Sequence, residues 1–149
     1  MPEYESLAHR YREIAVKTAS PLQLIVILYD AAVCSVQEAR KQMDCRDIAG
    51  RSRSINKCIA IISELQSCLN PEAGGEIAAS LDRLYDYMKW TAFLASVNQD
   101  NQPLVEIESL LDNLRCAWAE LANQACAAAT PAARQLAAAD YTKSLNISI

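Results

Sequence analysis

Residues that commonly carry out chemistry are sparse in this sequence of 149 residues. Its single histidine, His9, precedes the predicted helices, so neither a histidine-activated nucleophile nor the Glu-x-x-His pairs of a di-iron bundle can be assembled. Asp82 and Asp86 lie one helical turn apart and could imitate a glycosidase pair, but a solvated helix face explains them without a further assumption. The six cysteines show none of the two-residue gaps of zinc or redox motifs, so they are interpreted as reduced, mostly buried hydrophobic residues, at positions 34, 45, 58, 68, 116 and 126. The chain is therefore expected to be no enzyme and to bind neither metal nor cofactor.

Composition and charge narrow the class of protein further. Hydrophobic residues make up 52% of the chain and charged residues 21%, with only 3 glycines and 5 prolines, which favours a helical globular protein. The net charge of -4 argues against DNA or RNA as a partner, because nucleic-acid affinity comes largely from Lys and Arg side chains that neutralise phosphates. The start of the chain lacks the basic and apolar regions of a signal peptide, and no stretch approaches the roughly 20 apolar residues that span a membrane. We therefore expect a cytosolic protein without membrane insertion.

Apolar residues recur at alternating steps of three and four along much of the chain, which predicts four helices. The predicted helices cover residues 20–44, 55–69, 77–95 and 104–121. Ser20-Pro21 caps the first helix, which ends at residue 43 or 44, and Pro71 stops the second. Each helix is about 20 residues long and the links are short, so the predicted fold is all-α, an antiparallel up-and-down four-helix bundle. The regular heptad of the last helix predicts three core residues, Leu111, Leu114 and Trp118.

The chain divides into three predicted parts. Residues 1–19 form an N-terminal segment in which Tyr4, Leu7, Tyr11 and Ile14 would gather on one side of a short helix. Residues 20–125 form the four-helix bundle, and residues 126–149 form an alanine-rich tail with a weak packing face. We expect this tail to be partly mobile, with a short helix over residues 131–141.

The bundle has more apolar surface than one buried stripe per helix requires. Residues 24–29 are six consecutive apolar residues and cover the full circumference of the first helix, and residues 59–62 do likewise in the second. The third helix carries five large apolar residues around its axis: Tyr85, Tyr87, Trp90, Phe93 and Leu94. Either another part of the chain or a second copy covers this surface, or it binds a partner. Periodicity alone leaves the two alternatives open.

Three blocks of residues form a set of linked motifs along the chain. The first block is Val16-Lys17-Thr18-Ala19-Ser20-Pro21 followed by Leu24 and Leu28-Tyr29-Asp30-Ala31-Ala32. The second is Gly74-Gly75-Glu76-Ile77-Ala78 with Leu81 and Leu84-Tyr85-Asp86-Tyr87-Met88, and the third is Leu110-Leu111 with Leu114-Arg115 and Ala117-Trp118. Together these blocks resemble the FliS family of flagellin export chaperones, in the family's order and spacing over roughly residues 11–121. The chain departs from the family where Ala31 replaces a usual glycine, and around Trp90 and Ala92, where basic residues and leucine are common.

The resemblance implies a four-helix chaperone that wraps the disordered C-terminal segment of flagellin around its outside. It would prevent premature filament assembly and present flagellin to the type III export gate, with export-gate components, a co-chaperone or an anti-sigma factor as further partners. The flagellin groove is expected to contain Tyr11, Ile14, Leu24, Ile27, Leu28, Ile61, Tyr85, Tyr87 and Trp90. Residues 1–19 are predicted to act as a removable lid on part of this groove. The alternatives are a secretion chaperone or adaptor for another client, and a structural homodimer.

Overall fold

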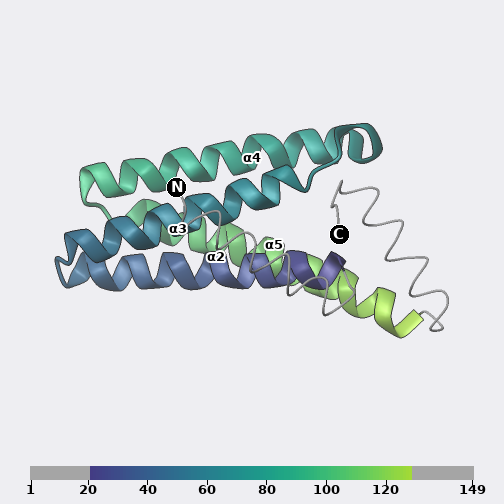
Figure 1. Cartoon of the computed structure of the whole chain (residues 1–149), viewed down its shortest axis with the longest axis horizontal. Helices are drawn as coiled ribbons and strands as arrows, with labels where there is room; N and C mark the ends of the chain where they lie inside the picture. The colour runs from purple at the N-terminus through teal and green to yellow at the C-terminus, as the bar shows by residue number, and fades with distance from the viewer. Residues whose placement is uncertain (1–20, 129–149) are drawn as a thin grey trace.

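The computed structural model describes residues 21–128, which form four α-helices (Figure 1). The helices are α2 (Pro21–Asp44), α3 (Ile48–Ser67), α4 (Pro71–Asn98) and α5 (Gln102–Ala128), and the described residues contain no strand. The all-α four-helix prediction is therefore confirmed. The predicted N-terminal lid and the short helix over residues 131–141 lie outside the described residues.

Each link between helices ends on a side chain that caps the next helix. Asp47 accepts a hydrogen bond from the backbone N–H of Gly50 at the start of α3, and Asn70 accepts two from the first turn of α4. Asp100 accepts one from the N–H of Gln102 at the start of α5. These side chains satisfy N–H groups that have no partner within the helix. Because each link is so short, consecutive helices must run antiparallel.

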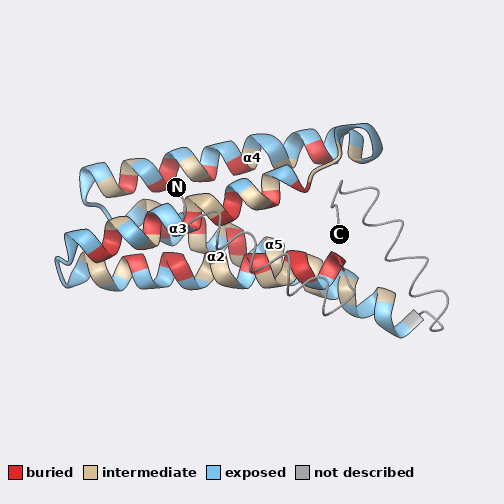
Figure 2. Cartoon of the chain, viewed as in Figure 1, coloured by how far each residue is buried: buried red, intermediate tan, exposed pale blue. Residues whose placement is uncertain are grey.

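The helices form a closed ring of neighbours, in which α2 and α4 each pack against α3 and α5 (Figure 1). Contacts of α2 with its two neighbours are more extensive than those of α4. Buried residues follow the sides of the helices that face one another (Figure 2). The central core includes Leu28, Tyr29, Ile62, Met88 and Leu111. α4 is therefore the helix held by the least side-chain packing.

Three helices have boundaries that differ from the prediction. α3 begins at Ile48, before the predicted start at residue 55. The apolar pattern did not reveal these first turns, because their polar residues show no apolar period. α4 begins at Pro71, so the residues predicted as a turn are mostly helical, and the break is confined to a kink at Gly75. Gly75 has φ 54° and ψ -130°, a conformation that side-chain-bearing residues rarely adopt. α5 also continues to Ala128, into residues assigned to the alanine-rich tail.

α2 is long and apolar enough to cross a membrane by length and composition alone, so the expectation that no stretch reaches this length is wrong for α2. Half of its most apolar window is buried inside the bundle. Leu24, Ile25, Leu28 and Tyr29 all contribute to the core. Packing between two neighbouring helices therefore accounts for the apolar character of α2.

Candidate partner-binding surface

The structure buries four of the nine residues expected in the partner groove. Leu24 and Leu28 of α2, Ile61 of α3 and Tyr85 of α4 are all core residues with almost no exposed surface. The run of apolar residues in α2 is buried because this helix packs against α3 on one side and α5 on the other. The groove prediction for these four residues would require the bundle to open, and their burial gives the apolar runs a simpler explanation.

The other expected groove residues are placed differently. Ile27 is half-buried on α2, whereas Tyr87 and Trp90 are exposed on α4. Tyr11 and Ile14 lie outside the described residues. Of the nine, only Tyr87 and Trp90 thus present large exposed side chains within the described part of the chain.

Tyr87 and Trp90 belong to a larger apolar row on the outside of α4, which we call the α4 aromatic face. It consists of Tyr87 (46% exposed), Trp90 (60%), Phe93 (48%) and Val97 (59%). Spacings of three, three and four residues place them on one side of the helix. The Trp90 and Phe93 rings stack with their centroids 5.6 Å apart. Phe93 and Val97 were not predicted as site residues, although their spacing from Trp90 carried the signal.

Other large apolar residues exposed in the described part of the chain are scattered. They are Ile48, Ile77, Val105 and Leu121. Single exposed apolar residues are normal on protein surfaces, whereas a contiguous aromatic row marks an interaction site more often. The α4 aromatic face is therefore the strongest candidate for a partner-binding surface.

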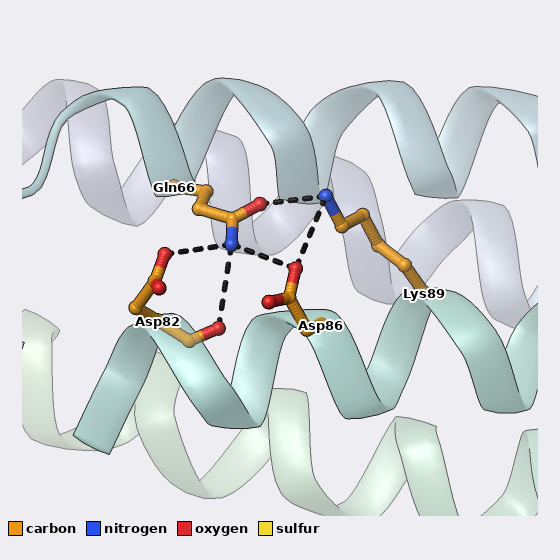
Figure 3. A network of polar contacts seen from close by, with 4 residues as sticks. All are labelled: Gln66, Asp82, Asp86 and Lys89. Atoms are coloured by element: carbon orange, nitrogen blue, oxygen red, sulfur yellow. Dashed lines mark hydrogen bonds and ion pairs between the residues drawn. The ribbon is translucent and has the colours of Figure 1, made fainter. Parts of the chain in front are cut away.

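On the side toward α3, a polar network holds the helix that carries this face (Figure 3). The Gln66 side-chain amide of α3 donates to Oδ1 of Asp82 (2.7 Å) and to Oδ1 of Asp86 (2.9 Å), both on α4. Lys89 Nζ donates to Gln66 Oε1 (2.6 Å) and lies 3.6 Å from Asp86 Oδ1. One glutamine thus bridges three residues on successive turns of α4, which sets the register of α4 against α3.

On the side toward α5, a side-chain hydrogen bond links α4 to α5. The Tyr87 hydroxyl donates to Oε1 of Glu106 at 2.6 Å. This bond to a carboxylate raises the pKa of Tyr87, because the negative charge of Glu106 favours the protonated phenol. The Tyr87 ring therefore lies toward α5 and forms one edge of the α4 aromatic face.

Comparison with known proteins identifies the family. The family described as "Flagellar protein FliS" matches residues 4–125. The chain belongs to the FliS family. It is 39% identical over 114 residues to the flagellar secretion chaperone FliS of Salmonella typhimurium, covering 76% of this chain and 84% of the relative.

More distant relatives carry the same description. The flagellar secretion chaperone FliSB of Pseudomonas aeruginosa is 35% identical over 106 residues, with 71% of this chain and 84% of the relative covered. The FliS of Bacillus subtilis is 30% identical over 108 residues, with 72% and 80% covered. These relatives are named as chaperones and not as enzymes, which agrees with the absence of a catalytic constellation expected from the sequence.

The three motif blocks that resemble this family meet inside the bundle. Tyr29 of the first block and Tyr85 of the second share a buried hydroxyl–hydroxyl hydrogen bond, and Trp118 of the third lies close enough to the Tyr29 hydroxyl to influence its pKa. Burial raises the pKa of Tyr29 to about 12, although Tyr85 and Trp118 act in the opposite direction. Burial also raises the pKa of Tyr85, so both phenols stay neutral at physiological pH. The motif residues at this point join α2, α4 and α5.

Residues predicted for the core of α5 occupy it to different degrees. Leu111 is fully buried, whereas Leu114 and Trp118 are half-buried and pack against the core. An ion pair also links α5 to α2: Arg115 Nε of the third block lies 3.6 Å from Asp30 Oδ1 of the first. The described motif residues of α2 and α5 thus contribute to the core and to this ion pair, whereas the α4 aromatic face is exposed.

Proposed function

We propose that this chain is a cytosolic flagellar export chaperone that binds the C-terminal region of flagellin. Binding keeps flagellin from polymerising prematurely and assists its delivery to the flagellar type III export apparatus. Membership of the FliS family and the chaperone names of its relatives support this proposal. The observation that carries it on this chain is the α4 aromatic face, a solvent-exposed row of large apolar side chains on a helix whose register is set by the Gln66 network.

The face has the form that helix recognition requires. An amphipathic client helix presents apolar residues at steps of three and four, and Tyr87, Trp90, Phe93 and Val97 repeat at the same steps on α4. Tyr and Trp also combine a large apolar body with a polar group, which suits a surface that must be soluble alone and apolar when bound. A disordered client loses entropy when it binds, so an extensive contact can still be released for export.

Calorimetry with a C-terminal flagellin peptide tests this function and its site. The intact chain should bind the peptide with one chain per client. Trp90→Ala and Phe93→Ala should each weaken binding by at least about tenfold, because buried aromatic residues dominate helical interfaces. Ile77→Ala is the matched control: Ile77 is an even more exposed apolar residue of α4, but it lies about 140° around the axis from Trp90. We expect it to change the affinity by less than about twofold.

Two results would count against the proposal. An intact chain that does not bind flagellin would overturn the function, and capture of a different flagellar export substrate would then favour the adaptor alternative. Binding that is equally sensitive to Ile77→Ala and Trp90→Ala would overturn the site while leaving the function in place.

A further inference from the structure

We propose that residues 76–98 of α4, which we call the α4 segment, open away from the rest of the bundle as a unit while α2, α3 and α5 stay folded. The open form is a minor state of the free chain, and the chain reaches it without unfolding globally. The motion belongs to the bundle itself and involves no client, so it goes beyond the proposed function.

The backbone leaves the helical conformation at both ends of the α4 segment. Gly75, directly before it, has φ 54°, and Gln99, directly after it, has φ 53°. A Cβ added at Gly75 would meet no atom within 4 Å, so this glycine serves the backbone angle and not a close contact. Hinge motions are absorbed by a few residues at the ends of an element. Gly75 and Gln99 therefore bound a helical unit that can move as one piece.

The α4 segment packs more weakly than α2, the helix diagonally opposite. α4 contacts α3 and α5 less extensively than α2 does. Of the six residues that α4 buries, Tyr85 and Met88 are large, and the other four are small: Ala78, Thr91, Ala92 and Ala95. α2 buries Tyr29 and four leucine and isoleucine residues: Leu22, Leu24, Ile25 and Leu28. Because less apolar surface returns to water, separating α4 from the bundle costs less free energy than separating α2.

Polar contacts hold the α4 segment mainly at its exposed edges. The bonds that the Gln66 amide donates to α4, and the bond that Glu106 accepts from Tyr87, are solvent-exposed. Water can replace exposed bonds when the helix moves, so their net contribution is small. The hydroxyl bond between Tyr85 and Tyr29 is buried and must break. This buried bond keeps the open form a minor state.

Opening would uncover the apolar core that α4 helps to enclose. Tyr85 moves with the α4 segment, whereas Leu28 stays on α2 and Ile61 stays on α3. All three are expected in the partner groove from the sequence, and all three are core residues of the closed bundle. The open form is thus the state in which these residues can reach a second molecule, and the closed form keeps them out of water.

Native-state hydrogen exchange of the full chain without flagellin, measured by mass spectrometry, tests the opening. After correction for intrinsic rates, amides of the α4 segment should exchange at least about tenfold faster than those of residues 25–39 in α2. Equal protection of the two helices, within about twofold, would overturn the proposal, because the bundle would then open only as a whole. Stronger protection of the α4 segment would overturn it as well.

Two substitutions separate local opening from global unfolding. Gln66→Ala removes contacts of α4 that are lost in both processes, so exchange should rise at least about twofold in both α4 and α2. Arg40→Ala removes an ion pair between α2 and α5, in which Arg40 Nη1 lies 2.9 Å from Glu108 Oε2. The open form keeps this ion pair, so exchange should rise at least about twofold in α2 but stay within about 1.5-fold in the α4 segment. If Arg40→Ala accelerates both helices equally, the bundle is a single cooperative unit and the proposal fails.

Gln124→Ala is the matched control for Gln66→Ala. This exposed glutamine of α5 donates to Glu120 of its own helix, so its loss should leave exchange in α2 and α4 within about 1.5-fold. None of these measurements contains a client, so their outcome is separate from that of the proposed function. A uniformly protected chain that still binds the flagellin peptide would overturn only the opening. A chain whose α4 segment opens but that ignores flagellin would support the opening and overturn the chaperone function.

Discussion

Removing single hydroxyl groups from the Tyr29–Tyr85 pair should destabilise the bundle unequally. Both side chains are buried, and their hydroxyls bond to each other across the core, between the diagonally opposed helices α2 and α4. Trp118 of α5 lies near the Tyr29 hydroxyl and lowers its pKa. In Tyr85→Phe the Tyr29 hydroxyl keeps this polar neighbour, so the expected loss is about 1 kcal/mol, the net worth of one hydrogen bond.

Tyr29→Phe should cost more than Tyr85→Phe. It leaves the Tyr85 hydroxyl buried without its partner, and it removes the hydroxyl that lies beside the half-buried Trp118. A buried polar group without a partner costs about 1–3 kcal/mol, so this variant should lose about 2–3 kcal/mol. In the double variant Tyr29→Phe/Tyr85→Phe the orphaned Tyr85 hydroxyl is gone. We therefore expect the double variant to be more stable than Tyr29→Phe alone, by roughly 1 kcal/mol.

Urea unfolding of the full chain, followed by circular dichroism, gives the three free energies of unfolding. Tyr87→Phe is the matched control, because it removes an exposed hydroxyl from the same helix and should change stability by no more than about 0.5 kcal/mol. Two findings would refute the reasoning: losses that simply add in the double variant, or a Tyr85→Phe loss as large as that of Tyr29→Phe.

Three further predictions concern the core and the thiols. Leu111→Ala should lower the free energy of unfolding by about 3–5 kcal/mol, because it opens a cavity in the core, whereas the exposed Leu121→Ala should cost less than about 1 kcal/mol in the same urea experiment. In the folded chain, the buried Cys58 and Cys68 should resist a thiol reagent, whereas all six cysteines should react with it in urea. Rapid reaction of Cys58 and Cys68 in the folded chain would contradict their burial. The cysteines that should react at once are Cys34, Cys45, Cys116 and Cys126. Burial raises the pKa of Cys58 from 9.0 and of Tyr29 from 10.0, each to about 12. The free energy of unfolding should therefore be unaffected by these groups below pH 9 and fall between pH 9 and 12. A free energy that stays constant over this range would show that the two groups ionise equally well in the folded state.

Local signals in the sequence were enough to predict both ends of α2 and, within two residues, the end of α3. Pro21 at the start of α2 and Asn70-Pro71 between α3 and α4 have consequences that depend only on the neighbouring backbone. The first turns of α3 were missed because Arg51, Ser52 and Arg53 interrupt the apolar period, although Asp47 caps the helix as its residue type allows. The capping residue would therefore have located this boundary better than the apolar period did.

The binding surface was harder to predict because it depends on how many neighbours each helix has. A helix that is apolar all round either binds a partner or packs against neighbours on two sides, and α2 packs against α3 and α5. For α4, periodicity alone could have distinguished the core residues from the surface residues among those expected in the groove. Tyr85 and Tyr87 are two positions apart, hence about 200° around the helix, so they cannot share one face. Once Tyr85 lies in the core, Tyr87 must lie outside it.

In the last turns of α4, the distribution of side-chain size is the reverse of what folding alone would favour. After the buried Tyr85 and Met88, the helix presents the small residues Thr91, Ala92 and Ala95 toward the core, while Trp90 and Phe93 face outward. Burying a phenylalanine or residue of similar size contributes about 1.5–3 kcal/mol, a stabilisation that the free monomer leaves unused at two positions. Small inward residues also explain why α4 packs less extensively than α2, and why polar ties through Gln66 hold its register. Since the inward surface cannot use the aromatic residues, we expect a bound client helix to bury them.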